Sequence, residues 1–585
     1  MAAHLADPEN NPSFTRGVFL GELREDFIFP FPELPAEEKE NLTAILDSFR
    51  AWSDATVDTA KLDHDARFSD EVRTGMAELG MMGLNIPEEY GGFGASALLF
   101  SRVFGAVGET DAALAVYFGA HQSIGCKGIT LFGTDDQKKR WLPQCASGER
   151  IAAFCLTESG SGSDAQAMRT MAVPSADGTH YVLNGEKIWI SNAGYAGVFT
   201  VFAKVPVEVD GKPKQRVTAF IVDALAPGVS LGKIEEKMGI KASDTRTVSF
   251  KDVRVPLEDR LGEVGGGFKI ALEILNSGRL GLSAGSSRGA RKILDTALAF
   301  AKERKQFGRP IGSFEMIQKK FAVAAAECYA ADAGWIVAAS MVDRGGIDFS
   351  LETAACKIFA SDLSFRSACE AQQIAGGLGY SKEYPYEQAV RDARIMLIFE
   401  GTNEILRALI ALSGLQQPGE NLKAVGKAFK DPLRSLGAIG AYIGGRVKRQ
   451  VTKATFTKVH PALAEEAEMV ATAVHDLSGA VEKLLIEHGK DVIERQFHQE
   501  RLANSAIDIY LSTAALSRAT AAIGKVGEEK AHADIDNARI FVSMAMRRTR
   551  RALRAITHNQ DARLKAIAEA ALESGMLTVE TPTDV

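Results

Sequence analysis

The hydrophobic pattern of this 585-residue chain changes from a helical period to a period of two, and then back again. Between residues 151 and 256, short apolar stretches such as HYVLN, KIWIS and RVTAFIVD alternate or run briefly. Turn dipeptides separate them, among them Asn184-Gly185 and Asp210-Gly211. Apolar residues recur at helical spacing on both sides of this region. We therefore predict a mainly α protein with an inserted β domain.

The same pattern divides the chain into four regions. We predict an irregular arm and a helical N-terminal domain over residues 1–150, and a β-barrel-like or sandwich domain over 151–256. A helical bundle follows over 257–415, and a C-terminal helical extension over 416–585. The last boundary rests only on Gln416-Gln417-Pro418-Gly419, because proline and glycine interrupt helices.

Composition limits the class of protein. The net charge is -7, and this lack of a basic excess argues against a nucleic-acid partner. The six cysteines have no CxxC spacing, which favours reduced thiols in a cytosol-like compartment. No apolar run reaches about 18 residues, and the first 17 residues lack the features of a targeting segment. We expect a cytoplasmic protein.

One stretch could contact a membrane surface. Residues 433–464 contain six basic residues and no acidic one. Lysine and arginine together with apolar residues such as Ile439 and Tyr442 can lie on anionic lipid. A solvated helix face or a loop explains the composition equally well. A peripheral contact with the inner face of a membrane is one of two open interpretations.

Several common catalytic motifs are absent or out of context. The sequence has no Walker loop, no HExxH and no Cys/His cluster, so we expect no metal. Gly281-Leu282-Ser283-Ala284-Gly285 matches the GxSxG pattern of hydrolases. It lies inside a helical pattern with no strand before it, whereas a nucleophile elbow needs a strand, a turn and a helix. A hydrolase is therefore disfavoured.

Glu400 is a lone carboxylate in apolar surroundings. It follows the apolar run Ile395–Phe399 and precedes Gly401-Thr402 and an apolar helix that we expect to end at Gly414. Burial would raise the pKa of Glu400, which suits a base working near neutral pH. By itself, this carboxylate could equally complement the dipole of the helix that follows it.

Two adjoining segments of the β domain could form one wall of a flavin site. In FCLTESGSGSDA, residues 154–165, a strand runs into a Gly/Ser loop whose N–H groups and hydroxyls can hold a polar cofactor edge. In KIWISNAG, residues 187–194, Trp189 offers an aromatic face, and strand alternation places Ser191 on the same side. Taken singly, the loop could be an ordinary turn and the tryptophan a core residue.

Two further segments are suited to phosphate or to close backbone approach. RKQFG, residues 304–308, ends a long helix, and the Arg304 guanidinium can bind pyrophosphate oxygens bidentately. A cation that is favoured by the helix dipole is the alternative explanation. QQIAGGLGY, residues 372–380, either approaches a ligand or turns a corner, and it does not read as a dinucleotide-binding GxGxxG.

These segments occur together and in order, and the set resembles the acyl-CoA dehydrogenase family over almost the whole chain. FTRGVFLGEL, GAHQSIGCKGITLFGT, EKMGIKASDT, IFEGTNEILR and the helical extension are similar to its very-long-chain branch. The resemblance implies an FAD-dependent enzyme of fatty-acid β-oxidation. In such an enzyme Glu400 takes the α-proton and flavin N5 takes the β-hydride, so that a long-chain acyl-CoA becomes a trans-2-enoyl-CoA.

The resemblance also implies roles for individual residues, by their match to the family motifs. The residues expected at the cofactor are Phe154, Leu156, Thr157, Ser163, Trp189, Ile190, Ser191, Arg304, Gln306, Phe307, Gln373, Gly377, Thr402 and Glu404. Those expected at the substrate are Ser163, Asn276, Arg279, Glu400 and Gly401. Of the cofactor residues, Arg304, Gln306 and Phe307, together with Gln373 and Gly377, are expected to reach the FAD of a neighbouring subunit, which implies a homodimer.

Some branches of the family place their base on the earlier helix, where this sequence has Gly278, so Glu400 has no competitor. Gln388 stands where the family usually has a lysine or arginine, and Glu404 where many members have glutamine. The helix Ala112–Gly125 is expected to line the acyl pocket, with Tyr117 and Phe118 either shortening it or facing away.

Transfer of electrons to an electron-transfer flavoprotein is the leading interpretation of the acceptor. An acyl-CoA oxidase and an assembly factor built on the same fold are the alternatives.

Overall fold

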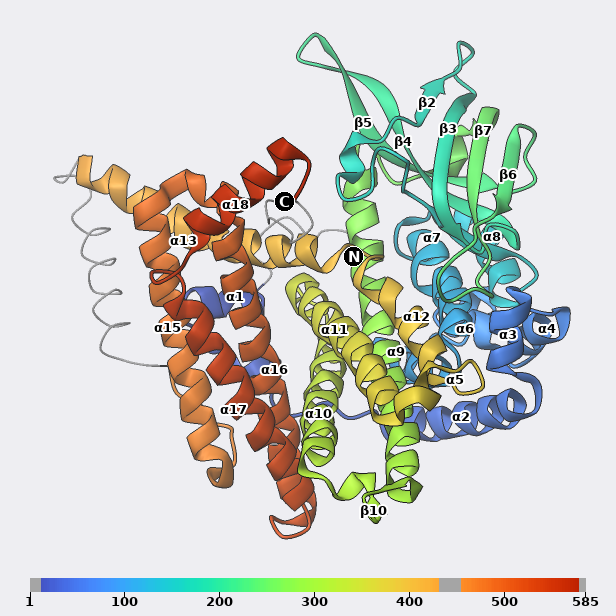
Figure 1. The fold of residues 1–585 in the computed structure, drawn as a ribbon. Coiled ribbons are helices and arrows are strands. Elements are labelled where there is room, and N and C mark those ends of the chain that lie inside the picture. The colour runs from blue at the N-terminus through green and yellow to red at the C-terminus, as the bar shows by residue number, and fades with distance from the viewer. Residues whose placement is uncertain (1–11, 431–453, 578–585) are drawn as a thin grey trace, which may run out of the picture.

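The structure is a computed structural model that describes residues 12–430 and 454–577 (Figure 1). A helical domain precedes the sheet. Thr134 begins its last helix with a capping box, in which its hydroxyl accepts from the N–H of Gln137 and the Gln137 side chain accepts from the N–H of Thr134. The helices are α1 (Phe14–Phe19), α2 (Ala36–Thr56), α3 (Thr59–Asp65), α4 (Asp70–Glu78), α5 (Ala97–Thr110), α6 (Ala112–Gly119), α7 (Lys127–Phe132) and α8 (Asp135–Ala146), with a π-helical turn, η4 (Ala120–Gly125), after α6.

The middle domain is an eight-stranded sheet. Its strands are β1 (Ile151–Cys155), β2 (Met171–Pro174), β3 (His180–Ser191), β4 (Ala196–Val209), β5 (Lys212–Asp223), β6 (Val229–Ile234), β7 (Thr245–Pro256) and β8 (Arg260–Leu261). The order is β6-β7-β3-β2-β4-β5-β8, with β1 parallel to β4. Tyr181 of β3 packs against Phe220 of β5, so the sheet curls around its own apolar core. The predicted inserted β domain is confirmed.

A second helical domain follows the sheet and carries Glu400. Its helices are α9 (Gly267–Glu303), α10 (Glu315–Arg344), α11 (Ser350–Ala375), α12 (Tyr386–Arg394) and α13 (Asn403–Lys430), with a small hairpin of β9 (Lys305–Gln306) and β10 (Arg309–Pro310). By length and composition α10 could cross a membrane, but 72% of its most apolar window is buried inside the protein. It packs against α9 and α11 of its own domain and against helices of the C-terminal extension (Figure 1).

The prediction that the helix after Glu400 ends at Gly414 is wrong, because α13 continues through Pro418 to Lys430. Gly414 has a packing role instead. A Cβ at this position would lie 2.6 Å from the ring of Phe19 in α1, so only glycine lets the two helices approach so closely. Pro418 has no backbone N–H to donate to the carbonyl oxygen of Gly414, so the helix continues past it without that one hydrogen bond.

The C-terminal extension is helical, as predicted, and consists of α15 (Ala464–His488), α16 (Gln496–Val526), α17 (His532–Arg554) and α18 (Asp561–Ser574). It packs beside α10, where the Tyr510 hydroxyl donates to the carbonyl oxygen of Gly334 (2.8 Å). Most of the basic stretch 433–464 lies outside the described residues. In its described end, Lys458 forms an ion pair with Asp26 of the N-terminal arm.

Candidate active site

Glu400 lies in a turn with unusual backbone geometry. It follows the short helical turn η9 (Ile395–Leu397) and has a φ of +59°, and Gly401 has a φ of +91°. The left-handed conformation costs a non-glycine residue roughly 1–2 kcal/mol, so other contacts must hold it. Arg279 of α9 donates from Nε to the carbonyl oxygen of Glu400 (3.1 Å). Lys357 of α11 donates from Nζ to the carbonyl oxygen of Gly401 (2.9 Å).

A buried polar network fixes the helix that follows the turn. Lys357 Nζ also donates to Asn403 Oδ1 (2.8 Å), and Asn403 Nδ2 donates to Asp362 Oδ1 (2.8 Å). Thr402 caps α13 as predicted, since its hydroxyl accepts from the N–H of Ile405 (3.4 Å). Neither Lys357 nor Asn403 was singled out from the sequence, although a lysine in an apolar helical stretch is a sign of a buried partner.

The carboxylate of Glu400 is enclosed although the residue as a whole is half-buried. Its Oε2 is buried without a hydrogen-bond partner. Burial raises the pKa of Glu400 to about 7, and the nearby cations Arg279 and Lys357 act in the opposite direction. Burial in turn lowers the pKa of Arg279 to about 10. A carboxyl group with this pKa can accept a proton at neutral pH.

Gly278 of α9 faces this carboxylate. A Cβ built on Gly278 would lie 3.0 Å from Glu400 Oε2 and 3.0 Å from Ile124 Cγ2. The position that holds an alternative base in other branches is therefore in contact with Glu400, and here it has no side chain. Asn276, two residues before Gly278, accepts from Arg279 Nη1 (2.7 Å), so the two predicted substrate residues are linked to each other.

Trp189 lies exposed on a bulge of β3. It has a φ of +60°, and the pairing of β3 with β7 gains one residue between Lys187 and Ile190. The indole is 58% exposed, whereas Ile190 is buried. Because the bulge interrupts strand alternation, alternation does not support the predicted placement of Ser191 on the same side of the strand as Trp189. An aromatic residue held in a strained conformation with its face open suits a flat ligand.

A buried ion pair, missed from the sequence, supports the Gly/Ser loop. Lys187 Nζ donates to Glu158 Oε1 (2.8 Å) and to the carbonyl oxygen of Leu156 (3.0 Å). Glu158 also accepts from the N–H of Thr170 (3.0 Å). These bonds join the loop to β3 at Lys187, two residues before Trp189. A lysine at an inward position of a strand was the available signal.

Much of the loop is open to solvent, although Ser161 is buried. Ser163 is exposed, Thr157 is half-buried, and a Cβ at Gly160 or Gly162 would meet nothing within 4 Å. Phe154 packs against Phe202 with ring centroids 5.1 Å apart. The loop therefore presents backbone and hydroxyl groups beside the aromatic face.

The residues expected at a neighbouring subunit's cofactor gather at another part of the molecule. Arg304, Gln306 and Phe307 lie in or before the β9–β10 hairpin and are exposed, with Phe307 94% exposed. An apolar cluster containing Ile293, Ala301 and Ile374 packs the ends of α9 and α11 together, so Gln373 and Gly377 are exposed at the same end.

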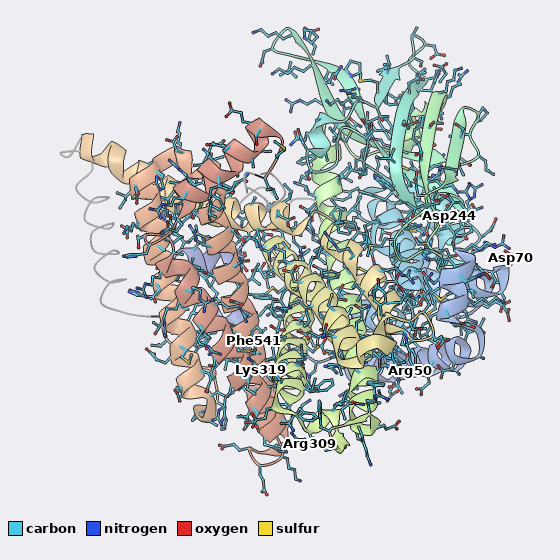
Figure 2. The ribbon with its side chains drawn as sticks, in the orientation of Figure 1. Arg50, Asp70, Asp244, Arg309, Lys319 and Phe541 are labelled. Atoms are coloured by element: carbon cyan, nitrogen blue, oxygen red, sulfur yellow. The ribbon has the colours of Figure 1, made fainter. Side chains whose placement is uncertain are left out.

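That end lies far from the Glu400 turn. Arg304 is 26 positions after Gly278 along α9, or about 39 Å at the helical rise. Figure 2 shows Arg309 of the hairpin and Asp244, which accepts from the N–H of Gly194 after Trp189, at well-separated places. One chain therefore cannot supply both groups to one small site.

A cavity of about 310 Å³ runs along α9, away from Gly278. The α9 residues that line it share the helix face of Gly278; they include Leu282, Gly285, Gly289, Ile293 and Thr296. From α6 it is lined by Ala112, Ala115 and Val116. Tyr117 and Phe118 face away, because Tyr117 packs against Phe68 and Phe118 against Phe100. The other end is polar, with Asp111, Gln388 and Asp392.

A buried carboxylate base and an open aromatic face are both features that suit a flavin-dependent dehydrogenase, which removes a proton and a hydride from adjacent carbons. Family models match the chain in sequence. They are the acyl-CoA dehydrogenase N-terminal domain (residues 39–149), middle domain (153–253) and C-terminal domain (265–415), and the ACAD9/ACADV C-terminal domain (461–577). The chain belongs to the acyl-CoA dehydrogenase family.

Individual relatives agree with the models. The very long-chain specific acyl-CoA dehydrogenase of Bos taurus mitochondria is 40% identical over 97% of this chain and 89% of its own length. A crystal structure of an acyl-CoA dehydrogenase complexed with FAD from Bacillus anthracis has a TM-score of 0.80 and 32% identity, over 97% of this chain and 96% of the other. A structure of the electron transferring flavoprotein of Acidaminococcus fermentans has a TM-score of 0.60 and 35% identity, over 65% of this chain and 98% of the other.

The residues of this site fit FAD, the cofactor of the family. The open Trp189 face suits the flat ring, and the open Gly/Ser loop suits its polar edge. The exposed guanidinium of Arg304 suits a pyrophosphate.

Proposed function

We propose that this protein is an FAD-dependent acyl-CoA dehydrogenase of fatty-acid oxidation that acts on long-chain acyl-CoA, with Glu400 as the base. One observation carries the proposal: Glu400 presents a buried, unpartnered carboxylate with a pKa near 7, facing Gly278. When bound, the flavin accepts the hydride from the β-carbon of the substrate. The product is a trans-2-enoyl-CoA.

The residues of the chain position the substrate and move the proton. A carboxylate oxygen of Glu400 takes the α-proton of the substrate. The backbone N–H of Glu400 polarises the thioester carbonyl, which makes that proton more acidic. Arg279 holds the Glu400 carbonyl oxygen and so keeps the left-handed turn in place. The apolar residues around the carboxylate exclude water, which keeps the pKa of Glu400 high.

The cavity along α9 supports a long acyl chain. The face from Gly278 to Thr296 spans 18 positions, or about 27 Å, and cavity-lining residues recur along it. Tyr117 and Phe118 lie in the core and do not shorten it.

An electron-transfer flavoprotein is the proposed electron acceptor, and the likeness to the Acidaminococcus fermentans structure supports a partner of that kind. An acyl-CoA oxidase would instead pass the electrons to oxygen and produce peroxide. A dehydrogenase should turn over with an artificial electron acceptor and form little peroxide. A homodimer is proposed from the separation along α9 between Gly278, which faces Glu400, and Arg304. A peripheral membrane contact through 433–464, in a cytoplasmic protein, remains a proposal from composition.

The direct test is Glu400→Gln, with Glu420→Gln, an exposed glutamate on α13, as the matched control. Glu400→Gln should retain its yellow flavin and bind acyl-CoA, because its shape is nearly unchanged. It should lose dehydrogenation by several orders of magnitude, since the base is gone. Turnover within about tenfold of wild type would exclude Glu400 as the base. Normal growth on fatty acids with Glu400→Gln would favour the assembly-factor alternative.

A further inference from the structure

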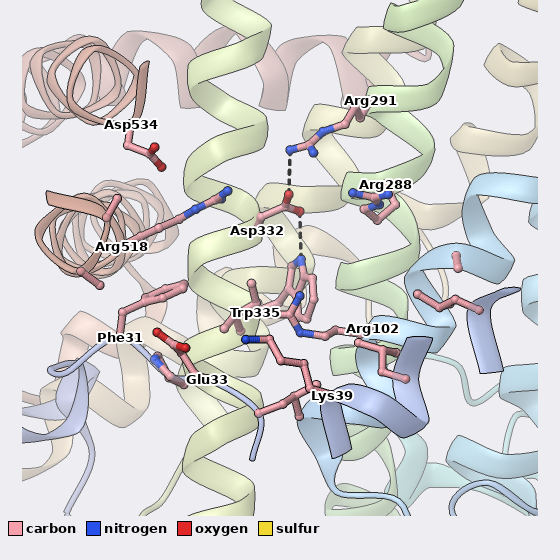
Figure 3. A pocket seen from close by; sticks show the side chains of 18 of the residues that line it. Phe31, Glu33, Lys39, Arg102, Arg288, Arg291, Asp332, Trp335, Arg518 and Asp534 are labelled. Carbon is pink, nitrogen blue, oxygen red and sulfur yellow. Dashed lines mark hydrogen bonds and ion pairs between the residues drawn. The ribbon is translucent and has the colours of Figure 1, made fainter. Parts of the chain in front are cut away.

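A second cavity, of about 470 Å³, lies where the N-terminal arm, both helical domains and the C-terminal extension meet (Figure 3). It is separate from the cavity along α9, because Arg288 and Arg291 line it from another face of that helix. Its size falls within the range of small-molecule sites.

The lining of this cavity carries an excess of positive charge. Seven cationic side chains line it, against three carboxylates, although the whole chain has a net charge of -7. The cations are Lys39, Arg50, Arg102, Arg288, Arg291, Arg518 and Lys525, and the carboxylates are Glu33, Asp332 and Asp534.

Ion pairs neutralise only some of these cations. Arg288 pairs with Glu109 (2.7 Å), Arg291 with Asp332 (2.8 Å) and Lys525 with Glu33. Asp332 has no oxygen to spare, since its other oxygen accepts from Trp335 Nε1 (3.1 Å) and the Ser287 hydroxyl (2.8 Å).

Arg102 is the central unneutralised group. Its Nε is buried without a hydrogen-bond partner. Burial lowers the pKa of Arg102, and the charges of Arg518 and Arg288 act in the same direction, whereas the carboxylates of Asp332 and Glu33 act against them. Figure 3 shows these three arginines converging from different helices. A partly buried guanidinium beside two others is unfavourable unless an anion joins them.

Arg518 is pre-positioned for such an anion. It donates from Nη1 to the carbonyl oxygen of Tyr329 (3.0 Å), and its guanidinium lies 4.0 Å from the centroid of the Tyr329 ring. Both contacts fix its geometry without neutralising its charge.

We propose that this cavity binds a small soluble molecule with two or more clustered oxyanion charges, phosphate or carboxylate. Arginine forks bind both groups bidentately. The apolar lining, including Phe31, Leu42 and Ile336, suits an organic body on the ligand. Since Arg102 belongs to α5 and Arg518 to α16, the ligand joins the N-terminal domain to the C-terminal extension.

The test uses the full-length FAD-loaded protein, saturated with CoA so that the substrate's own phosphate sites are filled. Inorganic pyrophosphate and citrate are titrated by calorimetry, against sodium chloride at equal ionic strength. At least one of these probes should bind, with one molecule per chain, and should raise the Tm of the protein. The probe that binds more tightly shows whether the cavity prefers phosphate or carboxylate groups. No heat beyond the chloride control for either probe would overturn the proposal.

Variants assign the binding to this cavity. Arg102→Gln should weaken binding by about tenfold or more and keep dehydrogenase activity, because a charge-assisted bond is lost far from Glu400. Arg563→Gln, on exposed α18, is the control and should bind as wild type. If Arg102→Gln does not fold, Arg518→Gln takes its place. Unchanged affinity in the folded variant, or an equal loss in Arg563→Gln, would refute the site.

Discussion

Glu400 is held in two unfavourable states at once, a left-handed backbone and a buried carboxylate without a partner. Both follow from its position between Arg279, Lys357 and the bare backbone of Gly278. Strain of this kind is typical of residues kept for function and not for stability.

The pKa of Glu400 predicts the pH profile. Its raised pKa, about 7 in the ligand-free protein, leaves the carboxyl neutral on the acid side. Because the base must be ionised, kcat/KM should fall about tenfold per unit below pH 7 and level off above it. Steady-state assays from pH 5.5 to 9 check this. A flat profile across pH 6 to 8 would contradict the assignment.

The raised pKa of Glu400 also predicts how the free energy of unfolding depends on pH. The folded protein holds the Glu400 proton more tightly than the unfolded chain, so this group's stabilising contribution is lost as pH rises from about 4.5 through 7. Glu400→Gln, which does not ionise, should therefore be more stable than wild type at pH 8, by about 1–3 kcal/mol. The difference should shrink towards pH 5. Denaturant unfolding at the two pH values measures it, and an equal difference at both would refute the burial argument.

At the scale of elements, α9 combines three tasks along one helix. Gly278 faces Glu400, residues between Leu282 and Thr296 line the cavity proposed for the acyl chain, and Arg304 follows the last turn of the helix. On the same helix, Gly281 admits the Phe104 ring, which would lie 2.6 Å from a Cβ. Small residues on α9 thus set how closely the N-terminal domain approaches it.

Filling the cavity should change chain-length preference. Gly289 lines it and has room for a Cβ, whose nearest neighbour would be 3.5 Å away. Gly289→Leu should lower kcat/KM for the longest acyl-CoA substrates by tenfold or more and leave short ones nearly unchanged, because only a long chain reaches that depth. Gly524→Leu, at an open position on α16, is the control. A uniform loss at all chain lengths would show that the cavity does not hold the acyl chain.

Elements with a regular period were predictable, and local departures from it were not. The period of two identified the β domain, and Thr402 was recognised as a cap from its own side chain. The bulge at Trp189 was not, because it depends on the pairing of β3 with β7. The Glu158–Lys187 pair joins residues 29 positions apart, and Gly414, which we expected to end α13, instead packs inside it against the distant Phe19. Such features come from long-range packing, which periodicity does not report.

At the scale of the whole molecule, the base and Arg304, which one flavin site needs, lie far apart. Gly278, which faces Glu400, is roughly 39 Å from Arg304 along α9. Each site of the proposed dimer would take its base from one subunit and Arg304 from the other. The exposed hairpin, with Phe307 94% exposed, is consistent with a partner at that surface.

Mixed dimers test the shared site. Glu400→Gln and Arg304→Gln should each be poorly active alone, the first from loss of the base and the second from loss of a pyrophosphate contact. Mixing the two proteins by refolding them together should restore activity, because each mixed dimer has one intact site of its two. If both groups served the same site within one chain, mixing would restore nothing, so unchanged low activity would rule out sharing.

The unbroken length of α9 also limits how this protein can be altered. Inserting one residue after Gly289 would turn everything beyond it by about 100° and shift it by about 1.5 Å. Arg304 would then point in a new direction while Gly278 stayed against Glu400. In the proposed dimer, the length of α9 would fix the distance from the base of one subunit to the site to which its Arg304 contributes, so its residue count should be as constrained as its chemistry.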